Sequence, residues 1–405
     1  MKLPPRKVLV VDPIYHVHSV VHYRSALGSV GFESTEFTVL TSVVSAQEAE
    51  RLEKFQQSQP RVRIRLLKQH PPISRRLQCL HQFWQTMRQV ERILAQEQFD
   101  ALIYLMADHM LPVFALPFAR LWFPHHFALG VRGLLFRHNG LRKTATTARR
   151  KCLELVDRWI MRRSLRSGGF TRLSFLDREA GRRAGALEET PICGEGVDPV
   201  DFPDCDRAHA RSVFGLSSDD FVFLMFGSID DRKGVIEAIE SLRAVENPDN
   251  RIVVLIAGRI APALRPRLQA MFESCDFRVV LHDRFVLDED LPNYFAAADC
   301  VVCSYKDFTA SSGVLLHGAS CGDLAVVSAQ GVMEDAVREF GFGEVVEVED
   351  RAAFASALRR LMHLSPTERD RMSAGARRYA RTHDFRLYMT QFLTLEEAAQ
   401  FPVKA

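Results

Sequence analysis

Short apolar runs alternate along the chain with longer stretches of helical periodicity. In the first half, apolar runs predict strands at residues 7–11, 37–40, 61–67, 101–106, 131–136 and 173–176. In the second half, similar runs predict strands at residues 221–226, 251–257, 278–282, 300–305 and 324–328. Stretches of helical periodicity, such as 75–96 and 234–245, separate many of these strands. This alternation is typical of parallel sheets covered by helices, so the pattern predicts an α/β protein.

Residues 194–206, GEGVDPVDFPDCD, are rich in Gly, Pro and Asp, have no periodicity and predict a linker. The linker divides the chain into a doubly wound domain at residues 1–195 and a second at 196–384, with a cleft between them. A chain of 405 residues is long enough for two such domains. We expect the last amphipathic helix, within 385–405, to pack back on the first domain.

Composition argues against export and membrane insertion. The polar, basic start of the chain and the short apolar run at 8–11 predict no signal peptide. Polar residues and prolines interrupt the most apolar region, 111–127, so no membrane span is expected. We therefore expect a cytoplasmic protein.

The eight cysteines show no paired spacing that would hold zinc. Cys300 and Cys303 form one CxxC, but they lie in an apolar strand and point to opposite faces of it. Reduced thiols without a metal are therefore expected.

Charge is distributed unequally. Residues 1–200 contain 30 Lys and Arg against 18 Asp and Glu, whereas the remainder contains 23 against 32. The basic excess concentrates at 61–76 and 142–166, and apolar residues are interleaved with the second stretch. Such a helix suits peripheral contact with an anionic membrane at its inner face, or it is a solvated helix whose apolar stripe packs in the core. Neither stretch contains a nucleic-acid-reading motif, so no nucleic-acid partner is expected.

The segment 307–327, DFTASSGVLLHGASCGDLAVV, follows a predicted strand and opens a helix. The small-residue turn Ala310-Ser311-Ser312-Gly313 leaves backbone N–H groups at a helix N-terminus, a geometry that binds phosphate or diphosphate. The structural alternative is an N-cap supplied by Ser311 or Ser312, with Gly313 giving room to pack.

Two more loops follow strands of the second domain. Residues 227–234, GSIDDRKG, place Gly227 at a strand end and the cations Arg232 and Lys233 before the next helix, where they suit a diphosphate leaving group. A solvated turn is the alternative. The loop 283–290 is expected to sit beside a nucleobase through the backbone around Val286.

Four stretches of the second domain carry a family resemblance: FLMFGSIDDRKGVIEAIESL (223–242), VVLIAGR (253–259), YFAAADCVVCSY (294–305) and SSGVLLHGASCGDLAVVSAQGVMEDAV (311–337). Together they resemble the donor-binding domain of retaining GT-B glycosyltransferases, in the large family that includes sucrose synthases and bacterial mannosyltransferases. The resemblance covers residues 215–345, and the first half matches only in general plan. It implies a GT-B fold of two Rossmann-like domains.

The resemblance also implies an activity. Such a transferase moves a sugar from a nucleoside-diphosphate sugar to a glycan, lipid or small-molecule acceptor, with retention, as in polysaccharide biosynthesis. It uses no metal and no cofactor besides the nucleotide-sugar co-substrate. The leaving diphosphate oxygen can take the acceptor proton, so catalysis rests on stabilising and positioning the phosphates.

Carried over residue by residue, the resemblance makes Lys233 the diphosphate-binding lysine, with Arg232 replacing an arginine that the family has where this chain has Ser228. Thr309 and His317 stand where the family has two glutamates, which contact the donor sugar and the ribose. Asp307 is a candidate for the sugar contact, and Glu334 is a weaker match. The donor-binding candidates are Gly227, Ser228, Val286, Asp307, Thr309, Ser311, Ser312, Gly313, Val314 and His317.

In the first domain, such enzymes often place a histidine at a strand end facing the donor sugar. His138, after strand 131–136, is the candidate here, beside Arg232 and Lys233 in the catalytic set. A structural role is the alternative for a lone histidine. His18, Asp108 and His109 are the acceptor-binding candidates.

Two other function classes stay open. The replacements at Thr309, His317 and Ser228 support the first of them. One is a GT-B-fold subunit that binds or scaffolds without catalysis. The other is a sugar-nucleotide epimerase on the same two-domain plan, which would convert the donor without any acceptor.

Overall fold

The chain divides into two compact units in a computed structural model. The first comprises Met1–Pro199 with Phe385–Ala405, and the second comprises Val200–Asp384. This boundary lies inside residues 194–206. The residues described are 6–12, 34–43, 46–67, 78–105, 107, 111–115, 127, 130–135, 148–166, 170–177, 180–181, 193–195, 200, 206–247, 249, 251–287 and 289–383. The helix predicted within 385–405 lies outside them.

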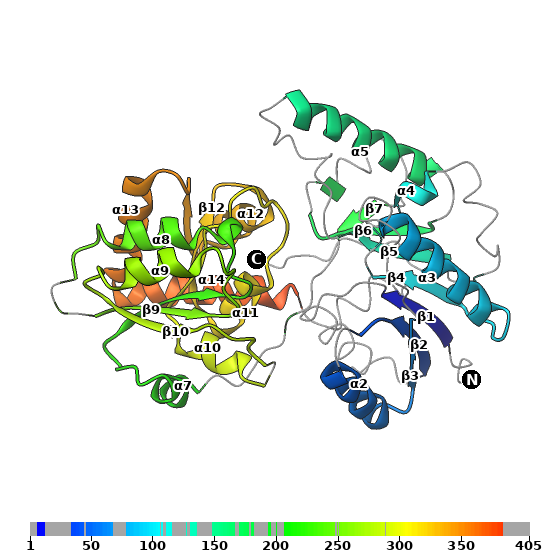
Figure 1. Cartoon of the computed structure of the whole chain (residues 1–405), viewed down its shortest axis with the longest axis horizontal. Helices are drawn as coiled ribbons and strands as arrows, with labels where there is room; N and C mark the ends of the chain where they lie inside the picture. Colours follow the sequence, from blue (N-terminus) through cyan, green and yellow to red (C-terminus); the bar gives the residue numbers. More distant parts are fainter. Residues whose placement is uncertain are drawn as a thin grey trace. The chain divides into compact units, whose positions relative to one another are not determined.

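The first unit contains a parallel sheet of seven strands in the order β3-β2-β1-β4-β5-β6-β7 (Figure 1). The strands are β1 (Arg6–Asp12), β2 (Thr35–Thr41), β3 (Val62–Leu66), β4 (Ala101–Tyr104), β5 (Gly130–Leu135), β6 (Arg172–Phe175) and β7 (Cys193–Glu195). The described helices are α2 (Ala46–Ser58), α3 (Gln78–Leu94), α4 (Leu111–Phe114) and α5 (Ala148–Arg166). The six strands predicted from apolar runs are confirmed, and β7 was not predicted.

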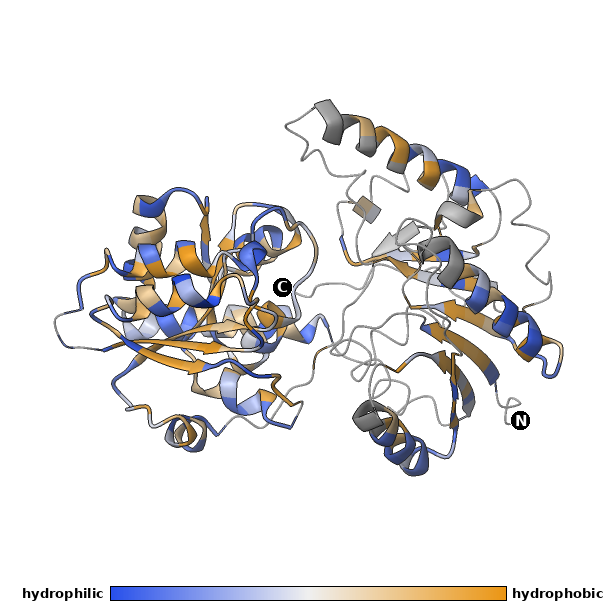
Figure 2. Ribbon diagram, viewed as in Figure 1, coloured by the Kyte–Doolittle hydropathy of each residue, from blue (hydrophilic) through white to orange (hydrophobic). Residues whose placement is uncertain are grey.

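Alternate residues of β1 face the two sides of this sheet, and residues 8–12 are buried. Leu9 and Val11 pack in a cluster with residues of α3, α4 and α5, whereas Val8 and Val10 pack in a second cluster against Phe55 of α2. Figure 2 shows the resulting apolar strands between more polar helices. Burial on both faces explains why these strands read as continuous apolar runs.

The second unit contains a parallel sheet of six strands in the order β10-β9-β8-β11-β12-β13. The strands are β8 (Phe221–Phe226), β9 (Ile252–Ala257), β10 (Arg278–His282), β11 (Cys300–Cys303), β12 (Leu324–Ser328) and β13 (Gly343–Val346). The helices are α7 (Arg207–Val213), α8 (Val235–Leu242), α9 (Arg265–Phe272), α10 (Leu291–Ala297), α11 (Gly313–Cys321), α12 (Gly331–Phe340), α13 (Arg351–Met362) and α14 (Pro366–Arg381).

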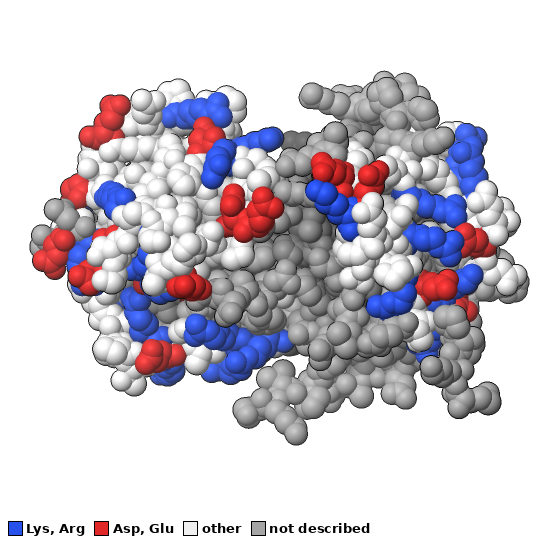
Figure 3. Space-filling view, turned by 90° about the horizontal axis from the view of Figure 1, so that it is seen from below, with Lys and Arg blue, Asp and Glu red and all other residues white. Residues whose placement is uncertain are grey.

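Helices cover both faces of this sheet. One core cluster joins the strands to α10, α11 and α12, and the other joins them to α8, α9 and α13. Cys303 belongs to the first cluster and Cys300 to the second, so the predicted opposite orientation of this CxxC pair is confirmed. Figure 3 shows acidic and basic side chains interspersed on one face of the unit.

Chain order reverses in the middle of the second sheet. β8 is followed outward on one side by β9 and β10, and on the other side by β11, β12 and β13. Loops that leave β8 and β11 therefore diverge from neighbouring strand ends, which is where ligands bind in open α/β sheets. The loops after β8 and β11 are residues 227–234 and 304–312.

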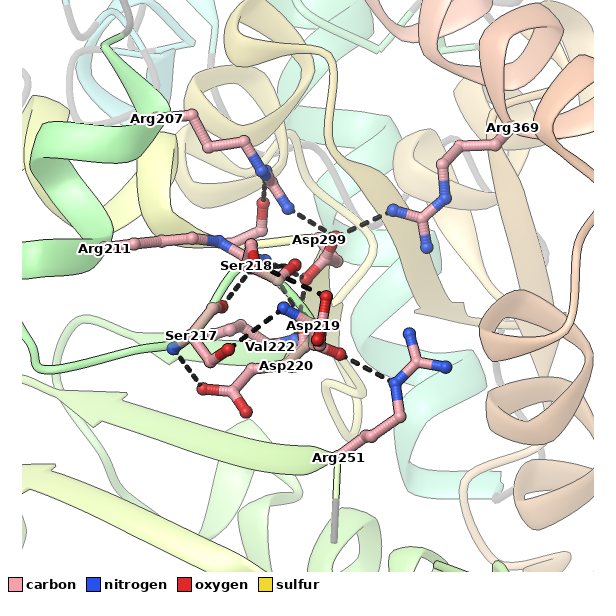
Figure 4. A network of polar contacts seen from close by, with 11 residues as sticks. Arg207, Arg211, Ser217, Ser218, Asp219, Asp220, Val222, Arg251, Asp299 and Arg369 are labelled. Atoms are coloured by element: carbon pink, nitrogen blue, oxygen red, sulfur yellow. Dashed lines mark hydrogen bonds and ion pairs between the residues drawn. The ribbon is translucent and has the colours of Figure 1, made fainter. Parts of the chain in front are cut away.

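A buried carboxylate stabilises the opposite, amino-terminal edge of this sheet. Asp299 precedes β11, and its oxygens accept from Arg207 at 2.5 Å, Arg211 at 2.6 Å and Arg369 at 2.8 Å (Figure 4). The backbone N–H of Val222 also donates to it, at 2.8 Å. Asp299 therefore ties α7 and α14 to the sheet.

Candidate functional site

The turn after β8 is built on close backbone packing. Gly227 donates its N–H to Ala257 O at 2.9 Å, and a side chain at Gly258 would place its Cβ 1.8 Å from Gly227 O. Only glycine fits at Gly258, where φ is +131°. The turns that follow β8 and β9 can therefore lie directly against one another.

Lys233 ends a 3-10 turn, Asp231–Lys233, and points back into the unit. Its Nζ donates to Phe226 O at 3.1 Å and to the hydroxyl of Tyr305 at 2.7 Å. The side chain is buried, and the burial lowers the pKa of Lys233 to about 8. Gly234 closes the turn at φ 62°, where a Cβ would lie 2.0 Å from Ser304 O.

The ammonium of Lys233 forms no ion pair with a carboxylate in the part of the chain that the structure describes. Its two hydrogen-bond acceptors are both neutral. An ammonium has three donors, so a third donor is available for a ligand. A Cβ on Gly227 would lie 3.4 Å from this Nζ, so glycine leaves the space beside the ammonium open.

Arg232 and Lys233 face different environments. The guanidinium of Arg232 lies 5.1 Å from the ring centroid of Phe308 and 5.5 Å from that of Tyr305, and its side chain is 38% exposed. Asp230 lies 3.8 Å from it. Lys233 is thus the buried cation of this turn, and Arg232 lies at its rim. Ser228 is exposed between Gly227 and these cations.

Ser312 occupies the N-cap position of α11, but its side chain makes no capping hydrogen bond. Its Oγ instead lies 3.2 Å from the Tyr305 hydroxyl. The structural alternative, in which Ser312 caps the helix, is therefore wrong. No acceptor is found in the described residues for the N–H groups of Gly313, Val314 and Leu315, the donors that a helix N-terminus presents.

Space is open at the start of α11. An added Cβ at Gly313 would meet no heavy atom within 4 Å. Since Lys233 and Ser312 contact the same phenol, the buried ammonium and the helix N-terminus face one region. This arrangement can bind a phosphate group by charge, by the helix dipole and by backbone N–H donation.

Thr309 and His317, at the positions where the resembling family has two glutamates, come shortly before and shortly after the start of α11. A Cβ on Gly331 would lie 2.4 Å from Thr309 Cα, and Val332 donates its N–H to Thr309 O at 3.1 Å, so α12 packs directly on Thr309. His317 lies one turn into α11 and stacks on Phe295, with ring centroids 5.2 Å apart. Asp307 has φ 51°, a strained value for a residue with a side chain.

Three more predicted residues, Val286, Glu334 and Ser311, can be placed in the second unit. Val286 is buried in the core of the unit, so only its backbone is available to a nucleobase. Glu334 pairs with Arg338 at 2.9 Å on α12. Ser311 directly precedes the N-cap and is half-buried. The candidates His18, Asp108, His109 and His138 lie outside the described residues.

Sequence reasoning missed Tyr305. Its ring is buried at the end of β11, and its hydroxyl contacts both Lys233 and Ser312. A tyrosine directly after a buried strand does carry a signal, because a buried phenol needs a hydrogen-bond partner. The sequence does not show that the partners are these two residues.

A cavity of about 450 Å³ lies away from this region, at the edge where Asp299 binds its arginines. Its charged lining comprises Arg207, Arg251, Arg369, Asp220, Asp299 and Asp370, so the two signs are equal in number. The cavity carries no excess of one charge that would select a ligand.

The described residues contain neither a metal-binding cluster nor a membrane-spanning helix. They contain no group of three or more His, Cys, Asp and Glu that could hold a metal ion. They also contain no helix with the length and apolarity that crossing a membrane requires.

Known proteins are similar to this chain in sequence. Residues 206–379 match the model of the family described as "Glycosyl transferases group 1". D-inositol 3-phosphate glycosyltransferase of Geodermatophilus obscurus is 32% identical over 204 residues, 47% of this chain and 43% of that protein. The Paenarthrobacter aurescens protein of the same name is 30% identical over 52% of this chain and 51% of its own length. The chain thus spans about half the length of the curated relatives it matches.

Solved structures resemble nearly the whole chain. The N-terminal domain of Candida albicans trehalose-6-phosphate phosphatase has a TM-score of 0.70 at 10% identity, covering 97% of this chain and 96% of that one. HepE of Anabaena, solved with UDP and glucose, has a TM-score of 0.66 at 14% identity, covering 95% and 98%. Sucrose-phosphate synthase of Thermosynechococcus elongatus also scores 0.66, at 16% identity, covering 95% and 97%. These likenesses establish the fold, and the predicted GT-B class of two Rossmann-like units is confirmed.

Proposed function

We propose that this protein is a glycosyltransferase that moves a sugar from a nucleoside-diphosphate sugar to an acceptor, with retention and without a metal. One observation carries the proposal. Lys233 Nζ, the Tyr305 hydroxyl and Ser312 Oγ form a series of contacts of 2.7 and 3.2 Å. These contacts join the start of α11 to a buried ammonium that has no ion pair within the described residues. The ammonium at one end of these contacts and the helix N-terminus at the other both favour an anion.

The chemistry follows from where charge develops. When the bond between sugar and diphosphate breaks, negative charge grows on the departing phosphate oxygen. A fixed ammonium and oriented N–H groups stabilise that charge more strongly than water does, because they need no reorganisation. The departing oxygen can also accept the proton of the acceptor hydroxyl, so the proposed mechanism needs no separate general base.

The comparisons support a nucleotide-sugar donor. The matching family model covers the part of the chain that contains Lys233, Tyr305 and α11. Relatives named as inositol phosphate glycosyltransferases match about half of the chain, and the structurally similar HepE was solved with UDP-glucose. We therefore propose a uridine nucleotide as the first donor to test, and a glycan, a lipid or a small molecule as the acceptor.

Calorimetric titration of UDP and GDP tests the donor site. We expect heat with at least one of them, and Lys233→Ala should weaken that binding by about 1.5–3 kcal/mol because it removes a charge-assisted contact. Lys306→Ala is the matched control. Lys306 is a neighbouring lysine that already pairs with Asp231 at 3.0 Å and Glu237 at 3.1 Å, so its loss should leave binding unchanged.

The absence of heat with both nucleotides at millimolar concentration would reject the donor site. Turnover is a separate measurement, made by following release of UDP from UDP-glucose with and without candidate acceptors. Tight binding without turnover would instead select the non-catalytic binding subunit. Conversion of the donor sugar without any acceptor would select the epimerase.

We further propose that α5 of the first unit contacts an anionic membrane from the cytoplasmic side. Leu155, Val156 and Trp159 are 63%, 48% and 59% exposed, so these apolar residues do not pack in the core. Arg162, Arg163 and Arg166 are exposed in the following turns of the same helix. Apolar side chains beside arginines suit the headgroup region of an acidic bilayer.

Sedimentation with vesicles tests this contact. We expect the protein to sediment with vesicles that contain phosphatidylglycerol and not with pure phosphatidylcholine, and Trp159→Ala should reduce the bound fraction. Leu66→Ala, another exposed apolar residue of the first unit, is the control. Equal binding to both vesicle types would argue against an electrostatic membrane contact.

A further inference from the structure

Tyr305 has no assigned role, yet it occupies the centre of the candidate site. It follows β11, its side chain is buried, and burial raises the pKa of its phenol well above the ordinary value. The phenol is therefore neutral and cannot act as a counter-charge for Lys233. What it offers is a hydroxyl with one proton and two lone pairs.

The direction of the hydrogen bond between Lys233 and this hydroxyl follows from the chemistry of the ammonium. The Lys233 ammonium can only donate, so the phenol oxygen accepts from it at 2.7 Å. The phenolic proton is then available to Ser312 Oγ, 3.2 Å away. One hydroxyl thus contacts both elements that the proposed diphosphate needs.

The contact with Ser312 has a consequence for α11. A serine at an N-cap normally accepts from the second or third N–H of its helix and so satisfies one of the free donors. Here Ser312 makes no such bond, because its Oγ is directed to Tyr305. Among the residues that the structure describes, the N–H groups at the start of α11 therefore have no acceptor and can bind a ligand.

We propose that Tyr305 is a positioning residue for the donor diphosphate: its hydroxyl orients the Lys233 ammonium and keeps Ser312 from capping α11. This inference rests on the proposed function, since it concerns the same site. Removal of the hydroxyl takes away one of the two hydrogen-bond acceptors of Lys233. It also leaves Ser312 free to cap the helix and compete with the anion.

The test is titration of UDP and GDP into the full-length protein and its variants between pH 6.5 and 9. Tyr305→Phe should lower the affinity for the bound nucleotide about tenfold near pH 7. Ser312→Ala should lower it about threefold, because the phenol loses the contact with Ser312 that holds its hydroxyl. The loss should be smaller than in Tyr305→Phe, because Lys233 keeps its phenol contact and no serine competes for the helix donors. Tyr379→Phe, a buried tyrosine of α14 that packs on Phe342, is the matched control and should bind as the wild type does.

The pH profile separates positioning from a structural effect. Wild-type affinity should fall as the pH rises past about 8, where Lys233 loses its proton. Tyr305→Phe should move the midpoint of this fall to lower pH by about one unit, because the ammonium has lost an acceptor. Lys233→Ala should abolish this fall. A general loosening of the site would lower the affinity evenly and leave the midpoint unchanged.

The outcomes distinguish the two proposals. If the wild type binds, Lys233→Ala loses binding, and Tyr305→Phe matches the wild type in affinity and midpoint, the role of Tyr305 is wrong and the proposed function stands. If the wild type binds neither nucleotide, both are wrong. If Tyr305→Phe does not fold, Ser312→Ala decides, and wild-type affinity in that variant overturns the inference.

Discussion

Replacing Lys233 by methionine should make the protein more stable without ligand and weaken its binding of a nucleoside diphosphate. Methionine has nearly the length of lysine and carries no charge, so it fills the same space. Lys233 is buried, and its hydrogen-bond partners among the described residues, Phe226 O and the Tyr305 hydroxyl, are both neutral. A buried charge without a counter-charge destabilises the folded state.

The size of this effect follows from the pKa. Lysine ordinarily has a pKa of 10.5, and that of Lys233 is about 8. At about 1.4 kcal/mol for each pH unit, the charged form costs the folded state about 3 kcal/mol. Loss of the two hydrogen bonds offsets about 2 kcal/mol, at about 1 kcal/mol for each. We therefore expect Lys233→Met to raise the free energy of unfolding by about 1 kcal/mol at pH 7.

The lowered pKa of Lys233 determines how the free energy of unfolding of the wild type changes with pH. Below pH 8, Lys233 is charged in both the folded and the unfolded state, and the full cost is present. Between pH 8 and 10.5 the folded state has released the proton while the unfolded state retains it, so the wild type gains stability as the pH rises. The advantage of Lys233→Met should therefore shrink across that interval.

The assay must report on the second unit. Trp84, Trp122 and Trp159 all belong to the first unit, so tryptophan fluorescence follows only that unit. Amide hydrogen exchange of peptides from β8 and β11, measured in increasing urea at pH 7 and pH 9.5, gives the stability of the second. Lys306→Met, which removes a lysine paired with two carboxylates, is the control and should not stabilise the protein.

Two results would refute this reasoning. If Lys233→Met is no more stable than the wild type at pH 7, the ammonium does not carry an uncompensated desolvation cost. If the difference between the two proteins is the same at both pH values, the stabilisation does not come from the charge. Either result would also remove the argument that the site favours an anion.

Three further changes test the surroundings of the site. Asp299→Asn should lower the free energy of unfolding of the second unit by about 3–5 kcal/mol, because three arginines lose their buried counter-charge, and hydrogen exchange in urea measures it. Gly258→Ala should destabilise the unit by about 2 kcal/mol or more and weaken UDP binding in calorimetry, because its Cβ would lie 1.8 Å from Gly227 O. Arg232→Ala should reduce UDP affinity about three- to tenfold without changing stability, since its guanidinium lies at the exposed rim.

Strands of the sheet interiors could be predicted because burial on both faces leaves a continuous apolar run. All six residues of β8 and of β9 are buried, and both strands were predicted to within one residue. β13 was missed for the opposite reason. It is a short edge strand, Gly343–Val346, and three of its four residues are half-buried, so its sequence lacks the apolar signal.

The candidate site could be predicted in part. Lys233 and the turn before α11 were identified because both follow strands of a parallel sheet, whose carboxyl ends lie at the edge where ligands bind. Their joint contact with Tyr305 could not be predicted, because Lys233 and Tyr305 are 72 residues apart and no local pattern relates them. The sequence did not show that Lys233 is buried while Arg232 lies at the rim, because this difference depends on the 3-10 turn that contains both residues.

The serine-rich turn shows why local sequence leaves a choice between structure and function open. The same Ser312 at the same N-cap position would satisfy its helix if its hydroxyl accepted from the helix N–H groups, and such a turn would have little affinity for an anion. What decides the matter is Tyr305, seven residues earlier, which binds the serine hydroxyl. Tyr305 in turn is placed beside Lys233 because β8 and β11 are neighbours where the strand order reverses. The binding capacity of the turn is therefore a property of the sheet topology, and a change at Tyr305 should alter it while the turn sequence stays the same.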